Sequence, residues 1–199
     1  MVGPDRRQVK DRQMNAVRSI GVAIGIPEPF RTELRDWRKR LGDPNAGLIV
    51  PHITLLGPTE VLASELATIE RHLAGVAVGY EPFVIRLQGS GTFRPLSPVV
   101  FVTLAQGTSC CELLEKAVRS GPLDRPARFS YHPHVTVAHE LDEVSLDRAF
   151  DLLAEYRAQF DATGFELYER GDDCAWRQLR HFPFAGGGGR PTWQDNEMR

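Results

Sequence analysis

The chain has 199 residues with a formal net charge of −2, 42% hydrophobic residues and 25% charged residues, the proportions of a soluble globular protein with a real core. The near-neutral charge argues against an extended duplex DNA interface, which needs a basic stripe, but a small nucleotide or a single RNA end requires only a few local cations. No apolar run is long enough to cross a bilayer, and the first sixteen residues lack the apolar stretch of a signal peptide.

The three cysteines indicate a reducing compartment. Cys110 and Cys111 are adjacent and Cys174 is distant, which is neither a disulfide framework nor a zinc-ligand spacing. We therefore expect a cytoplasmic protein, by default a monomer, that has no membrane partner.

The first half of the chain alternates strand and helix patterns. Apolar residues at i, i+4, i+7 and i+11 mark its two helices, and β-branched runs bounded by Gly or Pro mark its strands. The predicted elements are a strand over 18–26, a helix over 28–41 stopped by Gly42, a strand over 49–56 bounded by Gly57 and Pro58, a helix from an N-cap at Thr59 to a stop at Gly75, and a strand over 82–93.

The second half repeats this order. Its predicted elements are a strand over 98–105, a helix started by a Ser109–Glu112 capping box and ended at Gly121, a strand over 134–138, a helix after Ser145 whose apolar side includes Phe160, a strand over 163–170 and a returning strand over 174–184. We interpret this as an internal duplication with halves at about 18–93 and 98–170 in one domain over 17–184. Residues 1–16 are expected to be flexible and 185–199 disordered.

The helix predicted over 28–41 is rich in basic residues. Acidic residues interleave with the basic ones, which favours a solvated helix face over an RNA-binding patch. The residues concerned are Arg31, Glu33, Arg35, Asp36, Arg38, Lys39 and Arg40.

One motif, Pro-His-x-Thr, occurs twice, beginning at Pro51 and at Pro133. Chance would give this pattern roughly 0.02 times in a chain of this composition. Residues i and i+2 of a strand face the same side, so His52 projects with Thr54 and His134 with Thr136, while the residues between them enter the core. A pseudo-twofold axis between the halves would place the two pairs face to face across a cleft.

Two imidazoles facing one another can divide acid and base catalysis, because their ordinary pKa lies near 6.5. In-line displacement at phosphorus needs this division: one imidazole takes a proton from the nucleophile and the other protonates the leaving oxygen. Threonine hydroxyls can donate hydrogen bonds to the non-bridging oxygens. We assign His134 as general base and His52 as general acid, although the duplication makes the roles nearly interchangeable. No metal or other cofactor is required for a singly charged phosphodiester.

Neighbouring residues allow further interpretations. His132 and His134 have a metal-ligand spacing, so a zinc hydrolase with one more ligand is an alternative, but it leaves the doubled motif unexplained. Phe93, Arg94, Tyr131 and His132 could line the cleft and stack on a base, or could pack at strand ends. His139 has the opposite strand parity to His134, which predicts that it leaves the cleft for the rim.

The two motifs, with "YHPHVTVAHEL" and "GFELYERGDDCAWRQLRHFPF", resemble the 2H phosphoesterase superfamily, which includes RNA 2′,5′-ligase-like proteins and 2′,3′-cyclic nucleotide phosphodiesterases. The likeness covers about residues 17–184 and is nearest to a less characterised bacterial branch. It implies a bilobal α+β fold in which two antiparallel sheets with outer helices face a central cleft. It also implies catalysis by His52 and His134, with Thr54 and Thr136 on the phosphate.

The expected function is therefore metal-independent hydrolysis of a 2′,3′-cyclic phosphate or related phosphodiester at an RNA or nucleotide end. Ligase-like members commonly carry Arg five residues after the second motif histidine, where this chain has His139, which weakens the alternative of 2′,5′ RNA ligation. A non-catalytic module that binds nucleotides or RNA ends is a further alternative.

Overall fold

The computed structural model describes residues 15–127 and 129–186, so most of the predicted flexible segment 1–16 and tail 185–199 lies outside the described residues. The elements, in chain order, are β1 (Val17–Gly25), α2 (Phe30–Arg40), β2 (His52–Leu62), α3 (Leu66–Val78), β3 (Phe83–Thr92), β4 (Val99–Gln106), α4 (Thr108–Val118), β5 (His134–His139), α5 (Glu143–Leu153), β6 (Arg157–Ala162), β7 (Gly164–Arg170) and β8 (Trp176–Pro183). Short 3₁₀ turns occupy Ala63–Glu65 and Gly121–Leu123. Within the described ranges, no helix has the length and apolarity needed to span a bilayer.

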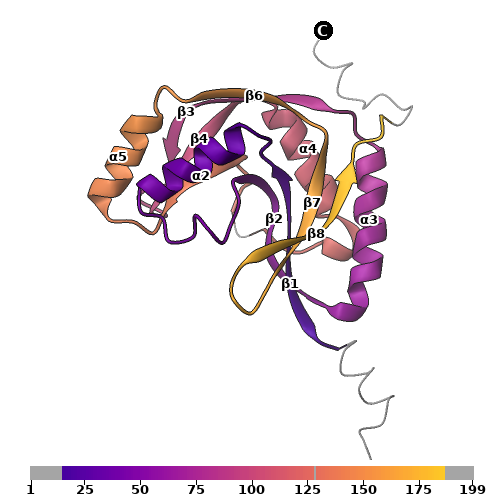
Figure 1. Cartoon of the computed structure of the whole chain (residues 1–199). Helices are drawn as coiled ribbons and strands as arrows, with labels where there is room; N and C mark the ends of the chain where they lie inside the picture. The colour runs from indigo at the N-terminus through magenta and orange to yellow at the C-terminus, as the bar shows by residue number, and fades with distance from the viewer. Residues whose placement is uncertain (1–14, 128, 187–199) are drawn as a thin grey trace, which may run out of the picture.

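The strands form one curled antiparallel sheet in the order β6-β3-β4-β5-β2-β1-β7-β8 (Figure 1). Four strands belong to each half of the sheet, and β2 pairs with β5 across the middle, where Ile53 lies opposite Val135. The predicted α+β class is confirmed. The two expected sheets are joined edge to edge at this central pair.

The halves of the sheet do not coincide with the halves of the sequence. Strand β3, from the first repeat, pairs with β4 of the second, and β7, from the second repeat, pairs with β1 of the first. The first helix of each repeat is exchanged as well, because α2 packs against β5 and α4 packs against β2. Each half of the molecule is therefore built from both repeats, which ties the two halves together.

Side-chain alternation along the strands separates the core from the opposite face. In β1, Ile20, Val22 and Ile24 are at most 1% exposed, and in the motif strands Ile53 and Val135 are fully buried. Each helix contributes an apolar side to the same core, including Leu34, Leu73, Leu114 and Leu146. The histidines and threonines of the two motifs lie on the other face and are half-buried. This confirms the predicted division of each motif strand into a core side and a polar side.

Strand β2 runs past the predicted stop at Gly57 and Pro58. These two residues oppose Gly21 alone, because Ile20 pairs with Thr59 and Val22 with Leu56, which is a β-bulge. The bulge absorbs the proline without ending the strand, so Thr59 lies in β2 and does not cap a helix.

The other helix ends also differ from expectation. The backbone N–H of Leu62 donates to the Glu65 carboxylate at 2.7 Å just before α3, which continues through Gly75 to Val78. Helix α4 starts after Gly107, whose φ of 94° is left-handed, and not from a Ser109 capping box. Phe160 belongs to β6 and not to α5, because residues 157–162 alternate exposed and buried in strand fashion. Helix packing against the sheet outweighed these local signals.

Ile53 is a test of the joint between the halves. We expect Ile53→Ala to lower the free energy of unfolding by about 2–5 kcal/mol, because it opens a cavity at a fully buried position between two packed layers. Leu152→Ala, on the exposed side of α5, is the matched control and should change stability by about 0.5 kcal/mol or less. Urea denaturation followed by circular dichroism measures both, and equal effects would contradict a structural role for the joint.

Candidate active site

The central strand pair brings the two motifs together. With Ile53 opposite Val135 in an antiparallel register, His52 comes opposite Thr136 and Thr54 comes opposite His134. His52 and Thr136 line one shared pocket of about 130 Å³. The four residues therefore lie on one face of the sheet at its middle, each histidine beside the threonine of the other repeat.

Each histidine is held by the same hydrogen bond. The Nδ1 atom of His52 lies 2.7 Å from the carbonyl oxygen of Val50, and the Nδ1 atom of His134 lies 2.7 Å from that of His132. A carbonyl only accepts, so Nδ1 carries the proton and donates, leaving Nε2 of the neutral ring as the basic atom. The Nε2 atom of His52 lies 3.1 Å from the Thr54 hydroxyl oxygen.

Burial lowers the pKa of both histidines below the ordinary value, because desolvation disfavours the imidazolium. The backbone carbonyl bonds oppose this shift. For His134, the neighbouring rings of His132 and His52 lower the pKa further, and for His52 the positive charge of Arg38 does so. The two rings interact electrostatically, so a proton on one disfavours a proton on the other. Both shifts favour the neutral rings, whose Nε2 atoms can accept a proton.

Arg38 corrects the prediction of a wholly solvated face on α2. It is 4% exposed, its Nε donates to the Asp43 carboxylate at 2.8 Å, and its Nη1 donates to the carbonyl oxygen of Ile49. Ile49 precedes Val50, whose carbonyl holds His52, and Arg38 lines the pocket shared by His52 and Thr136. The sequence signal was present: Arg38 lies four residues after Leu34, on the apolar side of the helix.

His139 also corrects an expectation, because it lines the pocket with His52 and Thr136. The alternation in β5 is interrupted: Phe101 pairs with Thr136 and Val100 with Ala138, so Val137 is an extra residue. This bulge shifts the parity of the strand and returns His139 to the cleft side.

Two of the proposed lining residues surround His134. The ring of Phe93 meets that of His134 edge-on at 4.9 Å between centroids, and the ring of His132 lies 6.3 Å from that of His134. Phe101, which sequence reasoning missed, lies 4.9 Å from His134 and 4.4 Å from Phe93. Gly91 makes room for it, since a Cβ there would come within 2.5 Å of the Phe101 ring. An aromatic wall therefore encloses one side of His134.

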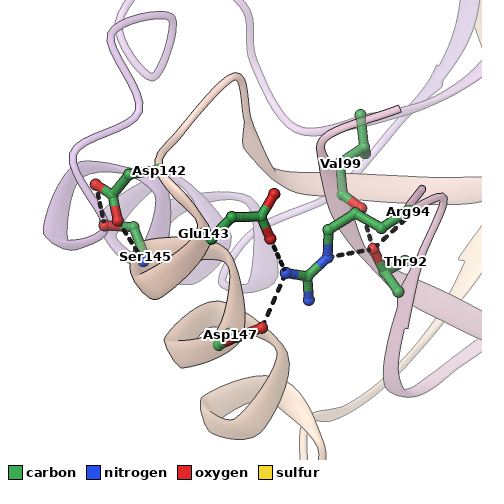
Figure 2. A network of polar contacts seen from close by, with 7 residues as sticks. All are labelled: Thr92, Arg94, Val99, Asp142, Glu143, Ser145 and Asp147. Carbon is green, nitrogen blue, oxygen red and sulfur yellow. Dashed lines mark hydrogen bonds and ion pairs between the residues drawn. The ribbon is translucent and has the colours of Figure 1, made fainter. Parts of the chain in front are cut away.

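Arg94 is directed at helix α5 (Figure 2). Its Nη1 donates to the carboxylates of Glu143 and Asp147 at 2.8 Å each, and its Nε donates to the Thr92 hydroxyl at 3.3 Å. The guanidinium is therefore neutralised by two carboxylates of α5. The structure thus gives Arg94 a role in fixing the loop after β3 to α5.

The side chain of Tyr131 contacts the backbone of the first motif. Its hydroxyl donates to the carbonyl oxygen of Thr54 at 3.0 Å, and burial raises its pKa. The phenol therefore stays protonated and braces β2 against the loop before β5.

The zinc alternative needs a third ligand near His132 and His134. In residues 15–127 and 129–186 no group of three or more His, Cys, Asp or Glu side chains is arranged to hold a metal ion. The described part of the chain thus offers two rings and no recognisable completing ligand.

The histidine environment can be tested by ¹⁵N NMR titration. We expect pKa values below about 6.5 for His52 and His134 and a neutral form protonated at Nδ1, because both rings are desolvated and bonded to carbonyls. His52→Gln should raise the pKa of His134 by removing a competing positive charge, whereas His72→Gln, on α3, should not. Neutral rings protonated at Nε2 would contradict the geometry.

The chain is similar to known proteins in sequence and in fold. A family model described as the 2′-5′ RNA ligase superfamily matches residues 26–173. A Halalkalibacterium halodurans protein named "Putative phosphoesterase" is 32% identical over 129 residues, 64% of this chain and 74% of that protein. One of the same name from Bacillus licheniformis is 32% identical over 150 residues, 75% of this chain and 85% of that protein.

Solved structures show the same fold. LigT of E. coli, complexed with 3′-AMP, matches with a TM-score of 0.62 at 21% identity, over 85% of this chain and 99% of that chain. The protein TT0787 of Thermus thermophilus matches with a TM-score of 0.58 at 22% identity, over 83% of this chain and 97% of that chain. With a family model that covers most of the described residues and relatives at 32% identity, the chain belongs to the 2′-5′ RNA ligase superfamily of 2H phosphoesterases.

Proposed function

We propose that the protein hydrolyses a 2′,3′-cyclic phosphate, or a related phosphodiester of a nucleotide or RNA end, without a metal ion. The observation that carries this proposal is the pair of identically anchored imidazoles, His52 and His134, presented on one face beside Thr136 and Thr54. Structures of the fold neighbour LigT with 3′-AMP and with phosphate support a substrate of this class.

In the proposed reaction, Nε2 of neutral His134 takes a proton from water as the water oxygen attacks phosphorus. The bond from phosphorus to one ribose oxygen breaks, and protonated His52 gives its Nε2 proton to that oxygen. The product is a ribose phosphomonoester with one free hydroxyl. The hydroxyl oxygen of Thr54, 3.1 Å from His52 Nε2, can accept a bond from a protonated ring, which supports His52 as the acid.

The threonine hydroxyls would stabilise charge on the non-bridging phosphate oxygens. Arg38 adds a positive charge at the wall of the same pocket, and its bond to Asp43 fixes its position. Attack by an alcohol in place of water would use the same groups in the same roles, so ligation is the same chemistry with a different nucleophile.

Turnover of a 2′,3′-cyclic-phosphate-ended oligonucleotide in excess EDTA is the direct test. We expect the wild type to be active and His52→Ala and His134→Ala each to lose about 10²–10⁴-fold in kcat, because each removes one proton transfer. His72→Gln replaces a histidine that bonds the Val118 carbonyl and does not line the pockets beside the motifs, and it should keep full activity.

Each other outcome of this experiment identifies an alternative. Activity abolished by EDTA and restored by zinc would overturn metal independence. Tight nucleotide binding without product would instead favour the non-catalytic binding module. Ligation of a 5′-hydroxyl oligonucleotide, assayed in parallel, distinguishes the transferase from the hydrolase.

The pH dependence follows from the lowered histidine pKa values. In the free enzyme one ring must be neutral and one protonated, so kcat/KM should be bell-shaped with its maximum on the acid side of about pH 6.5. A bound phosphate anion stabilises imidazolium, so the alkaline limb of kcat should lie at higher pH than that of kcat/KM. Steady-state kinetics from acid to alkaline buffers measures both, and a profile with a single limb would contradict a two-histidine mechanism.

A further inference from the structure

A pocket of about 160 Å³ opens beside His52 and Thr54, away from the aromatic wall around His134. Its lining is mostly apolar and includes Trp176 from β8 and Tyr168 from β7. Among the described residues that line it, only His52 can carry a positive charge, so this pocket, which we call the Trp176 slot, is unsuited to a phosphate. It suits a flat, weakly polar group attached to one.

The slot exists because the residues that line it between Trp176 and the first motif have small side chains or none. Gly21 has no side chain, and a Cβ there would lie 3.1 Å from the Trp176 ring, so the indole packs close to its backbone. Ala23, which pairs with Thr54, adds only a methyl group, and a Cβ added at Gly57 would meet no atom within 4 Å. The lining is thus open between Trp176 and the first motif.

In the other half of the molecule, larger side chains occupy the positions that correspond to the slot. Phe101 pairs with Thr136 as Ala23 pairs with Thr54, and His139 follows the second motif where Gly57 follows the first. The aromatic rings of Phe101 and Phe93 therefore occupy the side of His134 that corresponds to the slot. The duplicated site is symmetric in its acid–base groups and asymmetric in its lining, so the pocket beside His52 offers room for the body of a substrate.

The walls of the slot are held in place. The backbone N–H of Trp176 donates to the Leu48 carbonyl at 3.2 Å, which ties the β7–β8 hairpin to the loop before the first motif. Burial raises the pKa of Tyr168 to about 12, so its hydroxyl stays protonated and can donate to a ring nitrogen or carbonyl. An indole face and a phenol donor are the groups that recognise a heterocyclic base.

We propose that the Trp176 slot binds the base of the nucleotide whose phosphate lies between His52 and His134, with Trp176 as the stacking residue. This inference rests on the proposed function for the position of the phosphate, but it assigns the base side of the substrate to the first half of the molecule. The protein would then recognise the terminal nucleoside as well as its phosphate.

Binding of adenosine 3′-monophosphate and of ribose 3-phosphate, measured by calorimetry, tests the slot without requiring turnover. We expect Trp176→Ala to weaken the affinity for the nucleotide by about tenfold or more while leaving that for the sugar phosphate unchanged, with Trp176→Phe between. Leu179→Ala, an exposed apolar truncation on the same strand, is the matched control and should bind both ligands like the wild type.

Tryptophan fluorescence locates the base independently. The nucleotide should quench the wild type and Leu179→Ala but not Trp176→Phe, and ribose 3-phosphate should quench none of them. Because Trp176→Phe keeps an aromatic ring, it carries the test if the alanine variant does not fold by circular dichroism.

The outcomes separate the slot from the proposed activity. Three results would overturn the slot. Trp176→Ala could bind the nucleotide as tightly as the wild type does, or it could lose the same affinity for the nucleotide as for the sugar phosphate. The third such result is a wild type that does not bind the nucleotide. Selective loss of nucleotide binding in a wild type that hydrolyses no cyclic phosphate would uphold the slot and overturn the activity. If an active Trp176→Ala enzyme has an unchanged KM for a nucleoside 2′,3′-cyclic phosphate, the proposed activity is upheld and the slot is overturned.

Discussion

The contact between Ile53 and Val135 determines the geometry of everything around it. These two fully buried side chains pair where β2 meets β5, and their immediate neighbours are the four residues of the two motifs. Because alternate residues of a strand face opposite sides, burying the central pair forces both histidines and both threonines onto the other face together. The core and the site are therefore the two faces of one strand pairing.

The exchange of elements between repeats stabilises this arrangement. Each half of the sheet takes its third strand from the other repeat, and the first helix of each repeat packs on the other half. If the repeats had folded side by side, the central β2–β5 pair alone would have joined them. The exchanged strands instead hold the two motif strands at a fixed separation, which an acid–base pair requires because proton transfer depends on short distances.

A duplicated framework produces equal chemical groups on the two sides of the site, and differences in side-chain size distinguish those sides. The bonds from Nδ1 to the carbonyl two residues earlier are the same in both repeats. Each motif strand also has an extra residue three positions after its histidine, Leu55 in β2, in addition to the bulge at Gly57–Pro58, and Val137 in β5. Ala23 against Phe101 and Gly57 against His139 are the substitutions that break the symmetry. They leave a hollow beside His52 and an aromatic wall beside His134, so the surroundings of the symmetric histidine pair are unequal.

Electrostatics add to this asymmetry. Arg38 lies behind His52 and is fixed by a buried bond to Asp43, while His132 and the ring of His52 affect His134. Each of these neighbours disfavours protonation of the nearby imidazole. Both rings are thereby biased toward the neutral form, in which Nε2 can accept a proton.

From the chain alone we could read the repeat, the strand character of both motifs and which of their residues share a face, because strand alternation is a local property. The sequence also contained the apolar periodicity of α2. It did not contain the exchange of strands, since which strand edge pairs with which is decided by packing between distant segments. The bulges at Gly57–Pro58 and at Val137, which keep β2 running and return His139 to the cleft, depend on the facing strand. Arg38, Phe101, Tyr168 and Trp176 entered the site for the same reason: their local patterns are those of ordinary helix and strand residues, and only tertiary packing placed them beside the histidines.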